Sequence, residues 1–288
     1  MTWSPRSIST STFTANKQIR ARHRLIAAPL FSGGLDAFRV IRLNIAGTMD
    51  PTPSLFALMS FGPDGWGMRF VEGLVVTLEV SAASYFLSLI FGLLGASAKL
   101  STSPTLRRIA DLYTTLVRAL PELLLLLLIY FSGADAIKFV LSFISADFED
   151  VEIDPFIAAV AALGFIGGAY MTEVMRGAIL SIPTGQIEAA KASGMSKFLT
   201  LRRVIVPQML RYALPGMGNL WLSATKDSSL ISVLGQTQDL LFMGYRASAV
   251  TKHYGFFYSV AAIMFLGITI VSVIAIRIIE ARVNRGYR

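Results

Sequence analysis

Five long apolar segments limit what this chain can fold into. They lie at residues 71–98, 108–132, 155–180, 211–234 and 255–279. Each is long enough to cross a bilayer as a helix, which takes about 20 mostly apolar residues. Charged residues make up 15% of the chain, against roughly 25% in a typical soluble domain. We therefore expect an all-α, polytopic membrane protein with about five transmembrane helices.

The charges beside these segments predict how the chain is oriented in the membrane. Basic residues follow the first, third and fifth segments: Lys99, Arg107 and Arg108; Lys191, Lys197, Arg202 and Arg203; Arg277, Arg282, Arg285 and Arg288. The loop between the second and third segments is acidic instead. Because short loops rich in Lys and Arg remain cytoplasmic, this pattern predicts an N-out/C-in topology with residues 181–210 in the cytoplasm.

Residues 1–58 form a basic N-terminal segment. They contain seven Lys and Arg against two Asp and Glu, and their apolar runs are too short or too interrupted by charge to span a bilayer. Three interpretations are open: a cleaved targeting segment, an amphipathic surface helix, or a dispensable extension that is poorly ordered or lies upstream of the true start. We favour the extension, because Met59 leads directly into the first span.

Several kinds of chemistry are excluded by the sequence. The chain has no cysteine, so it forms no disulfides and no Cys-ligated metal sites, and His23 and His253 stand apart from any carboxylate cluster. No Gly-x-x-x-x-Gly-Lys-[Ser/Thr] phosphate loop occurs. Of the formal net charge of +8, residues 1–58 carry +5, and the remaining +3 comes from positive charges in loops beside the apolar segments rather than from a nucleic-acid-binding face. We expect no enzymatic activity, cofactor, metal or nucleic acid.

The segment 181–207 is a polar interruption between two spans. Thr184 is a candidate helix cap, residues 185–193 are long enough for about two helical turns, and Gly194 permits a left-handed turn that ends the helix. The small side chains Ala189, Ala190, Ala192 and Ser193 suit close docking in a cleft of another protein. Pro207 predicts a break before the next span. A surface helix parallel to the membrane is the alternative interpretation.

These residues also carry a family resemblance. Glu188-Ala189-Ala190, then Gly194, Ile205 and Pro207, resembles the EAA loop of permease subunits of type I ABC importers. Further stretches resemble the polar amino-acid branch of that family: 113–131, 168–179, 207–216, 219–221 and 226–232. The resemblance covers residues 65–280 and is closest to the histidine, lysine-arginine-ornithine and opine permeases. Ala119 and Gly167 depart from residues common in the family.

The resemblance implies a set of partners and a place in the cell. It makes residues 65–280 the transmembrane domain of an importer in the bacterial cytoplasmic (inner) membrane. A cytoplasmic ABC ATPase dimer would grip the EAA loop through Glu188, Ala189, Ala190, Gly194 and Pro207. A second permease subunit, related or identical, would complete the pathway, and a periplasmic or surface solute-binding receptor would deliver a polar, basic amino acid or opine.

Charged residues inside the apolar segments are candidates for the substrate pathway, because such groups usually face a cavity or a partner. They are Glu79, Glu122, Glu173, Arg176, Lys226 and Asp227. Glu173 and Arg176 lie three residues apart, so a local ion pair is also expected. Lys226 and Asp227 are adjacent and cannot face each other on a helix, so each needs a partner of its own. A secondary transporter, a channel subunit and a membrane assembly factor remain alternative functions.

Overall fold

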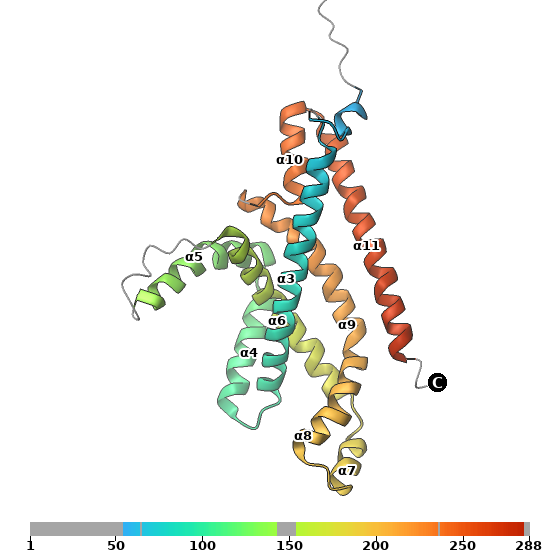
Figure 1. Cartoon of the computed structure of the whole chain (residues 1–288). Coiled ribbons are helices and arrows are strands. Elements are labelled where there is room, and N and C mark those ends of the chain that lie inside the picture. The colour runs from blue at the N-terminus through green and yellow to red at the C-terminus, as the bar shows by residue number, and fades with distance from the viewer. Residues whose placement is uncertain (1–53, 64, 143–153, 236, 285–288) are drawn as a thin grey trace, which may run out of the picture. The chain divides into compact units, whose positions relative to one another are not determined.

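Every regular element in the described part of the chain is helical. The computed structural model describes residues 54–63, 65–142, 154–235 and 237–284 (Figure 1). The chain divides after Ser54 into two units, and these helices belong to the second, Leu55–Arg288. The predicted N-terminal extension, apart from residues 54–58, and most of the acidic loop between the second and third segments lie outside the described residues.

The helices follow one another along the chain with short connections. They are η1 (Ala57–Met59), α3 (Gly67–Lys99), α4 (Pro104–Ala119), α5 (Glu122–Ser142), α6 (Pro155–Leu180), α7 (Thr184–Ala192), α8 (Lys197–Thr200), η3 (Leu201–Ile205), α9 (Val206–Asp227), η4 (Ser228–Leu234), α10 (Leu240–Thr251) and α11 (Tyr254–Asn284). Helix α10 and the start of α11 lie at the opposite end of the unit from α7 and α8 (Figure 1).

The pair α3 and α6 forms the centre of the unit because glycines let the two helices approach closely. A Cβ atom on Gly92 of α3 would lie 2.3 Å from the Cγ of Met171, and one on Gly95 would lie 2.2 Å from the Oγ1 of Thr172. Tyr113 of α4 adds a hydrogen bond of 2.6 Å from its hydroxyl to the carbonyl of Phe165. This central pair holds the elements that carry the candidate sites.

The chain bends sharply within the predicted span at 108–132. The axes of α4 and α5 meet at 115° across Leu120 and Pro121. A residue before proline is pushed away from helical geometry, and Leu120 has extended angles of φ −98° and ψ 150°. Pro121 then starts α5 by accepting the amide of Leu125. The bend places Glu122 at the start of α5 instead of inside a continuous helix.

The number of membrane crossings depends on this bend and on α9. Among the described residues, α3, α6 and α11 are each long and apolar enough to cross a bilayer, and α4 with the first part of α5 makes a fourth if the bent pair is one span. The predicted span at 211–234 corresponds to α9 followed by the 3-10 helix η4. It contains Arg211, Asn219, Lys226 and Asp227 and is less apolar than the others. A fifth crossing therefore stays a prediction.

Candidate coupling loop and polar transmembrane site

The polar loop between α6 and α9 begins with helix α7, and a defined turn at Gly194 ends that helix. Gly194 has a φ of +76°, which confirms the predicted left-handed turn. Its amide donates to the carbonyl of Lys191 at 2.9 Å, and the amide of Met195 donates to the carbonyl of Ala190 at 3.1 Å. These two bonds are those of a Schellman motif. The helix α7 is therefore held at a fixed angle to the residues that come after it.

The start of α7 differs from the prediction. Thr184 does not cap the helix, since it is already the first helical residue; Pro183 occupies the cap position and no side chain caps the amides. Proline at that position is extended, with ψ 127°, which sets the direction of entry from α6. Ser196, two residues after Gly194, does cap α8 by accepting the amide of Leu199 at 3.3 Å.

One face of α7 is exposed and the other is used for packing. Glu188 and Ala189 are exposed, but Ala190 is only 4% exposed, so the prediction that all the alanines offer a docking surface is wrong for Ala190. Ile187 packs against a buried cluster from α6, α9 and the α6–α7 connection. Phe198 of α8 is 70% exposed. The loop thus presents a mixed small and apolar surface to an outside partner.

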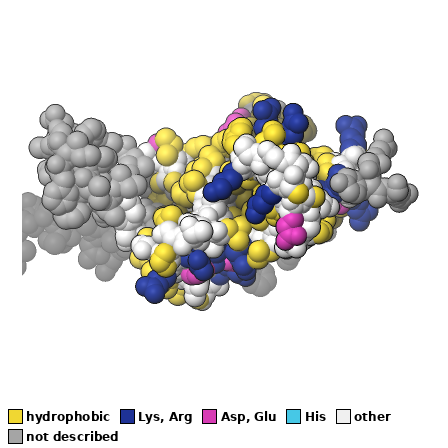
Figure 2. All heavy atoms as spheres, turned by 90° about the horizontal axis from the view of Figure 1, so that it is seen from below, with side chains coloured by type: hydrophobic (Ala, Val, Ile, Leu, Met, Phe, Trp, Pro, Cys, Tyr) yellow, Lys and Arg dark blue, Asp and Glu magenta, His cyan; other side chains and the backbone are white. Residues whose placement is uncertain are grey.

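The surface around this loop is positively charged. Lys and Arg side chains are spread over this end of the molecule and Asp and Glu side chains are few (Figure 2). The exposed basic residues of the loop are Lys191, Lys197, Arg202 and Arg203. An acidic partner surface, or the headgroups of anionic lipids, would complement this end electrostatically.

The loop is connected to α9 without an interruption of the helix, so the break predicted at Pro207 is wrong. The segment η3, residues Leu201–Ile205, is a π-helical turn, and Pro207 is the second residue of α9. Proline removes one amide from the helical ladder, and a single wider turn accommodates that loss. Gln208 also donates its side-chain amide to the side-chain carbonyl of Gln186. The Gln186–Gln208 contact and the continuous helix therefore connect α7 to the first residues of α9.

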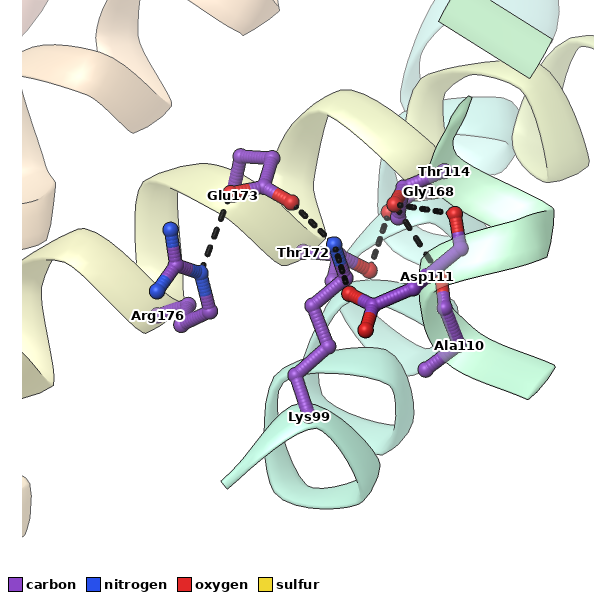
Figure 3. A network of polar contacts seen from close by, with 8 residues as sticks. All are labelled: Lys99, Ala110, Asp111, Thr114, Gly168, Thr172, Glu173 and Arg176. Carbon is purple, nitrogen blue, oxygen red and sulfur yellow. Dashed lines mark hydrogen bonds and ion pairs between the residues drawn. The ribbon is translucent and has the colours of Figure 1, made fainter. Parts of the chain in front are cut away.

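Glu173 lies in an ion network that joins three helices (Figure 3). The Nζ of Lys99 on α3 is 2.5 Å from one Glu173 oxygen and 3.0 Å from Asp111 of α4. The Nε of Arg176 is 3.1 Å from the other Glu173 oxygen, which confirms the expected local ion pair. The side chains of Lys99 and Glu173 are 9% and 22% exposed. The network joins the C-terminal end of α3 to the C-terminal part of α6 and to α4.

Asp227 and Lys226 occupy different surroundings. Asp227 lines a cavity of about 90 Å³ between α3, α5, α6, α9 and η4, whereas Lys226 is exposed on another side of α9. The polar residues of this cavity are Ser84, Tyr85, Ser88, Glu122, Tyr170, Ser223 and Asp227. The carboxyl groups of Glu122 and Asp227 thus face a common space. That space admits a few water molecules and is closed to an amino acid in this conformation.

Tyr170 lies between the cavity and the ion network. It lines the cavity of Asp227 and also an open hollow of about 400 Å³ that contains Lys99, Arg118 and Glu173. The guanidinium carbon of Arg118 lies 5.6 Å from the centre of the Tyr170 ring. The sequence did not single out Lys99, Arg118 and Tyr170 as site residues. Nothing in their spacing indicates these contacts, because each contact joins different helices.

Long apolar helices, a small cavity that two carboxyl groups line and an exposed helical loop are together typical of a membrane transport subunit. Residues 88–285 match the family described as binding-protein-dependent transport system inner membrane component, and the chain belongs to that family. This confirms the resemblance found in the sequence. Membership implies an ATPase and a solute-binding protein as partners, with ATP hydrolysis on the separate ATPase.

This chain covers nearly the whole length of two relatives. The octopine transport system permease protein OccQ of Rhizobium meliloti is 42% identical over 231 residues, which are 80% of this chain and 97% of the relative. The histidine/lysine/arginine/ornithine transport system permease protein HisQ of Salmonella typhimurium is 38% identical over 224 residues, 78% and 97% of the two chains. Both are named as permeases, so this chain is a transport subunit and not an enzyme.

Solved structures confirm the fold class. A chain of an amino acid ABC transporter crystallised with histidines superimposes with a TM-score of 0.64 at 29% identity, over 75% of this chain and 95% of that chain. The MetNI methionine ABC transporter gives a TM-score of 0.61 at 20% identity, over 76% and 97%. The second likeness shows the fold alone. The fold is that of an ABC importer permease, as the sequence predicts.

Proposed function

We propose that this permease imports polar, basic amino acids or opines and is driven through the loop α7–Gly194–α8. The coupling role rests on one combination of features: α7 is an exposed helix, the turn after it is fixed by hydrogen bonds, and the chain then continues as a helix into α9. A partner that pulls on α7 would move α6 and α9 together. Glu188, Ala189 and Gly194 belong to that contact, and Ala190 and Pro207 support it from within.

The substrate class is supported by the relatives' names and by the charge of the cavity. OccQ and HisQ are named for octopine and for histidine, lysine, arginine and ornithine. Glu122 and Asp227 place two carboxyl groups around one cavity, which suits a cationic side chain better than an anionic one. Glu173 and Arg176 act at the network end of the route, where they join α3 to α6. Lys226 would face the pathway only after the helices move.

The partners and the location belong to the same proposal. An ATPase dimer in the cytoplasm would hold the loop, a second permease would complete the pathway, and a periplasmic or surface receptor would supply the substrate. The subunit would lie in the bacterial inner membrane with an N-out/C-in topology. Because the chain has no cysteine, single-cysteine variants test this: Ser193→Cys should react with an impermeant maleimide from the cytoplasmic side, and Lys252→Cys from the outer side. The reverse pattern would contradict the orientation.

Reconstitution tests the coupling. The tagged chain is purified with its ATPase and second permease in lipid nanodiscs, and ATP hydrolysis is measured with and without loaded receptor. Glu188→Lys should lower receptor-stimulated hydrolysis, whereas Glu280→Lys, a matched change on α11, should not. Equal loss in both variants would contradict a specific role of α7. Transport without any ABC ATPase would favour the secondary-transporter alternative.

Uptake into proteoliposomes tests the pathway. Asp227→Asn should raise the apparent KM for a cationic amino acid, because the cavity loses one of its two carboxyl groups. Glu173→Gln should lower the stability of the complex and have little effect on its affinity for substrate, since Glu173 is already paired with Lys99 and Arg176. Unchanged affinity in both variants would remove these residues from the substrate route.

A further inference from the structure

One carboxylate of this chain is exposed in the middle of a membrane-spanning helix. Glu79 of α3 is exposed and has no hydrogen bond or ion pair with any described residue. Glu72, Phe86 and Leu93 are exposed at intervals of seven residues along the same helix. Residues seven apart on an α-helix share a face, so these side chains form one stripe, here called the α3 stripe, along the outside of the unit.

The depth of Glu79 is set by comparison with the neighbouring helix α11. Residues 254–276 of α11 contain no charged side chain, and this run is long enough to cross the hydrocarbon core. The ring of Phe257 near its start stacks on Phe70 of α3 at 6.0 Å. Both helices run in the same direction from that contact (Figure 1). Nine residues further along, Glu79 is therefore level with Leu266, close to the centre of the uncharged run.

A carboxylate at that depth requires a polar partner. Ionisable groups within transmembrane helices usually face a bundle interior, a cavity or another subunit rather than lipid. Acyl chains offer no hydrogen-bond donors, and the described residues of this chain offer Glu79 none. The exposed side chains of α11, by contrast, are apolar across its central part, for example Leu266 and Val271, as a lipid-facing helix requires.

We propose that the α3 stripe is an interface with the second permease subunit, which supplies a cationic or amide donor to Glu79. The stripe extends across the membrane, so a spanning helix is needed to cover it. The N-terminal residues 1–53 hold no apolar run of that length, and the ATPase and the receptor act outside the bilayer. The inference rests on the proposed pairing of two permeases and adds the face through which they meet.

Lipid exposure of two matched sites tests the proposal. Phe86 of the stripe and Val271 of α11 are 65% and 68% exposed in the single chain, and they lie within about 3 Å of one another in depth by the same register. Phe86→Cys and Val271→Cys are made in the full chain, labelled with bimane and assembled with ATPase and second permease in nanodiscs. Brominated lipid should strongly quench the bimane fluorescence of the Val271→Cys variant. It should quench the fluorescence of the Phe86→Cys variant much less. Equal quenching at both sites would overturn the proposal.

Cross-linking and substitution identify what covers the stripe. Phe86→Cys labelled with benzophenone maleimide should give, after illumination, an adduct whose cross-linked peptide comes from the second permease. An adduct only with lipid, or only with residues 1–53, would overturn the proposal. Glu79→Leu should release the second permease in native mass spectrometry and Glu79→Gln should retain it; equal retention would remove Glu79 from the contact. Receptor-stimulated ATP hydrolysis in the unsubstituted complex is measured alongside, because its absence would count against the proposed function instead.

Discussion

Replacing Gly194 by alanine tests whether the turn after α7 sets the strength of coupling. Gly194 has a φ of +76°, and apart from its two chain neighbours no described residue has an atom within 4 Å of where a Cβ would be placed. The space is therefore open, and the whole cost arises from the backbone. A left-handed conformation costs an L-residue with a side chain about 1–2 kcal/mol.

That cost converts directly into a change of population. A difference of 1–2 kcal/mol corresponds to a factor of roughly 5–30 in an equilibrium constant. The chain relieves the strain by giving up the turn, and with it the bonds from Gly194 to Lys191 and from Met195 to Ala190. If only loops with the intact turn engage the ATPase, receptor-stimulated hydrolysis falls by up to that factor at limiting ATPase concentration.

Gly185 provides the matched control within the same helix. A Cβ there also meets nothing within 4 Å, but its φ is not in the positive range, so Gly185→Ala should leave coupling unchanged. Gly194→Asn should give an intermediate loss, because asparagine tolerates the left-handed region better than alanine. ATP hydrolysis is measured with and without loaded receptor for all three variants. An equal effect of Gly194→Ala and Gly185→Ala would refute the argument from backbone geometry.

Two further predictions concern the centre of the unit. Gly92→Ala should destabilise the purified complex by about 1–3 kcal/mol, because the added Cβ would overlap Met171. Gly177→Ala should leave the stability unchanged, because a Cβ at that position meets no atom within 4 Å. Equal melting temperatures of the two variants would contradict the close-packing argument. Lys99→Met should cost about 3 kcal/mol by leaving Glu173 with Arg176 alone. Adding Glu173→Gln should recover part of that loss in a double-mutant cycle, and strict additivity would show that the two side chains are not coupled.

The sequence predicted best those features that depend on local composition. A run of apolar residues long enough to span a bilayer excludes most other folds, so α3, α6 and α11 were found with boundaries within a few residues. Gly194 was found because a left-handed turn at the end of a helix favours one residue type. The family was found because its motif is local as well.

Predictions about neighbouring helices were less successful, for a physical reason. The span at 108–132 contains Pro121, and the sharp bend there depends on the extended backbone that this proline imposes on Leu120. Ala190 looked equivalent to Ala189 in the sequence, yet it is buried because of the way α7 lies on the unit. Which face of a short helix is exposed depends on what packs beneath it.

The sequence by itself determined the class of the protein, the long apolar helices α3, α6 and α11, and the position of the polar loop between α6 and α9. Hydrophobicity, the length of an apolar segment and the conformational freedom of glycine are properties of short stretches of chain. They can therefore be inferred from the sequence without knowledge of the tertiary structure. The tertiary structure decided that Lys99 and Asp111 join Glu173, that Glu122 and Asp227 share a cavity, and that Glu79 faces outward. Each of these depends on distances between helices far apart in the sequence, and only packing sets such distances.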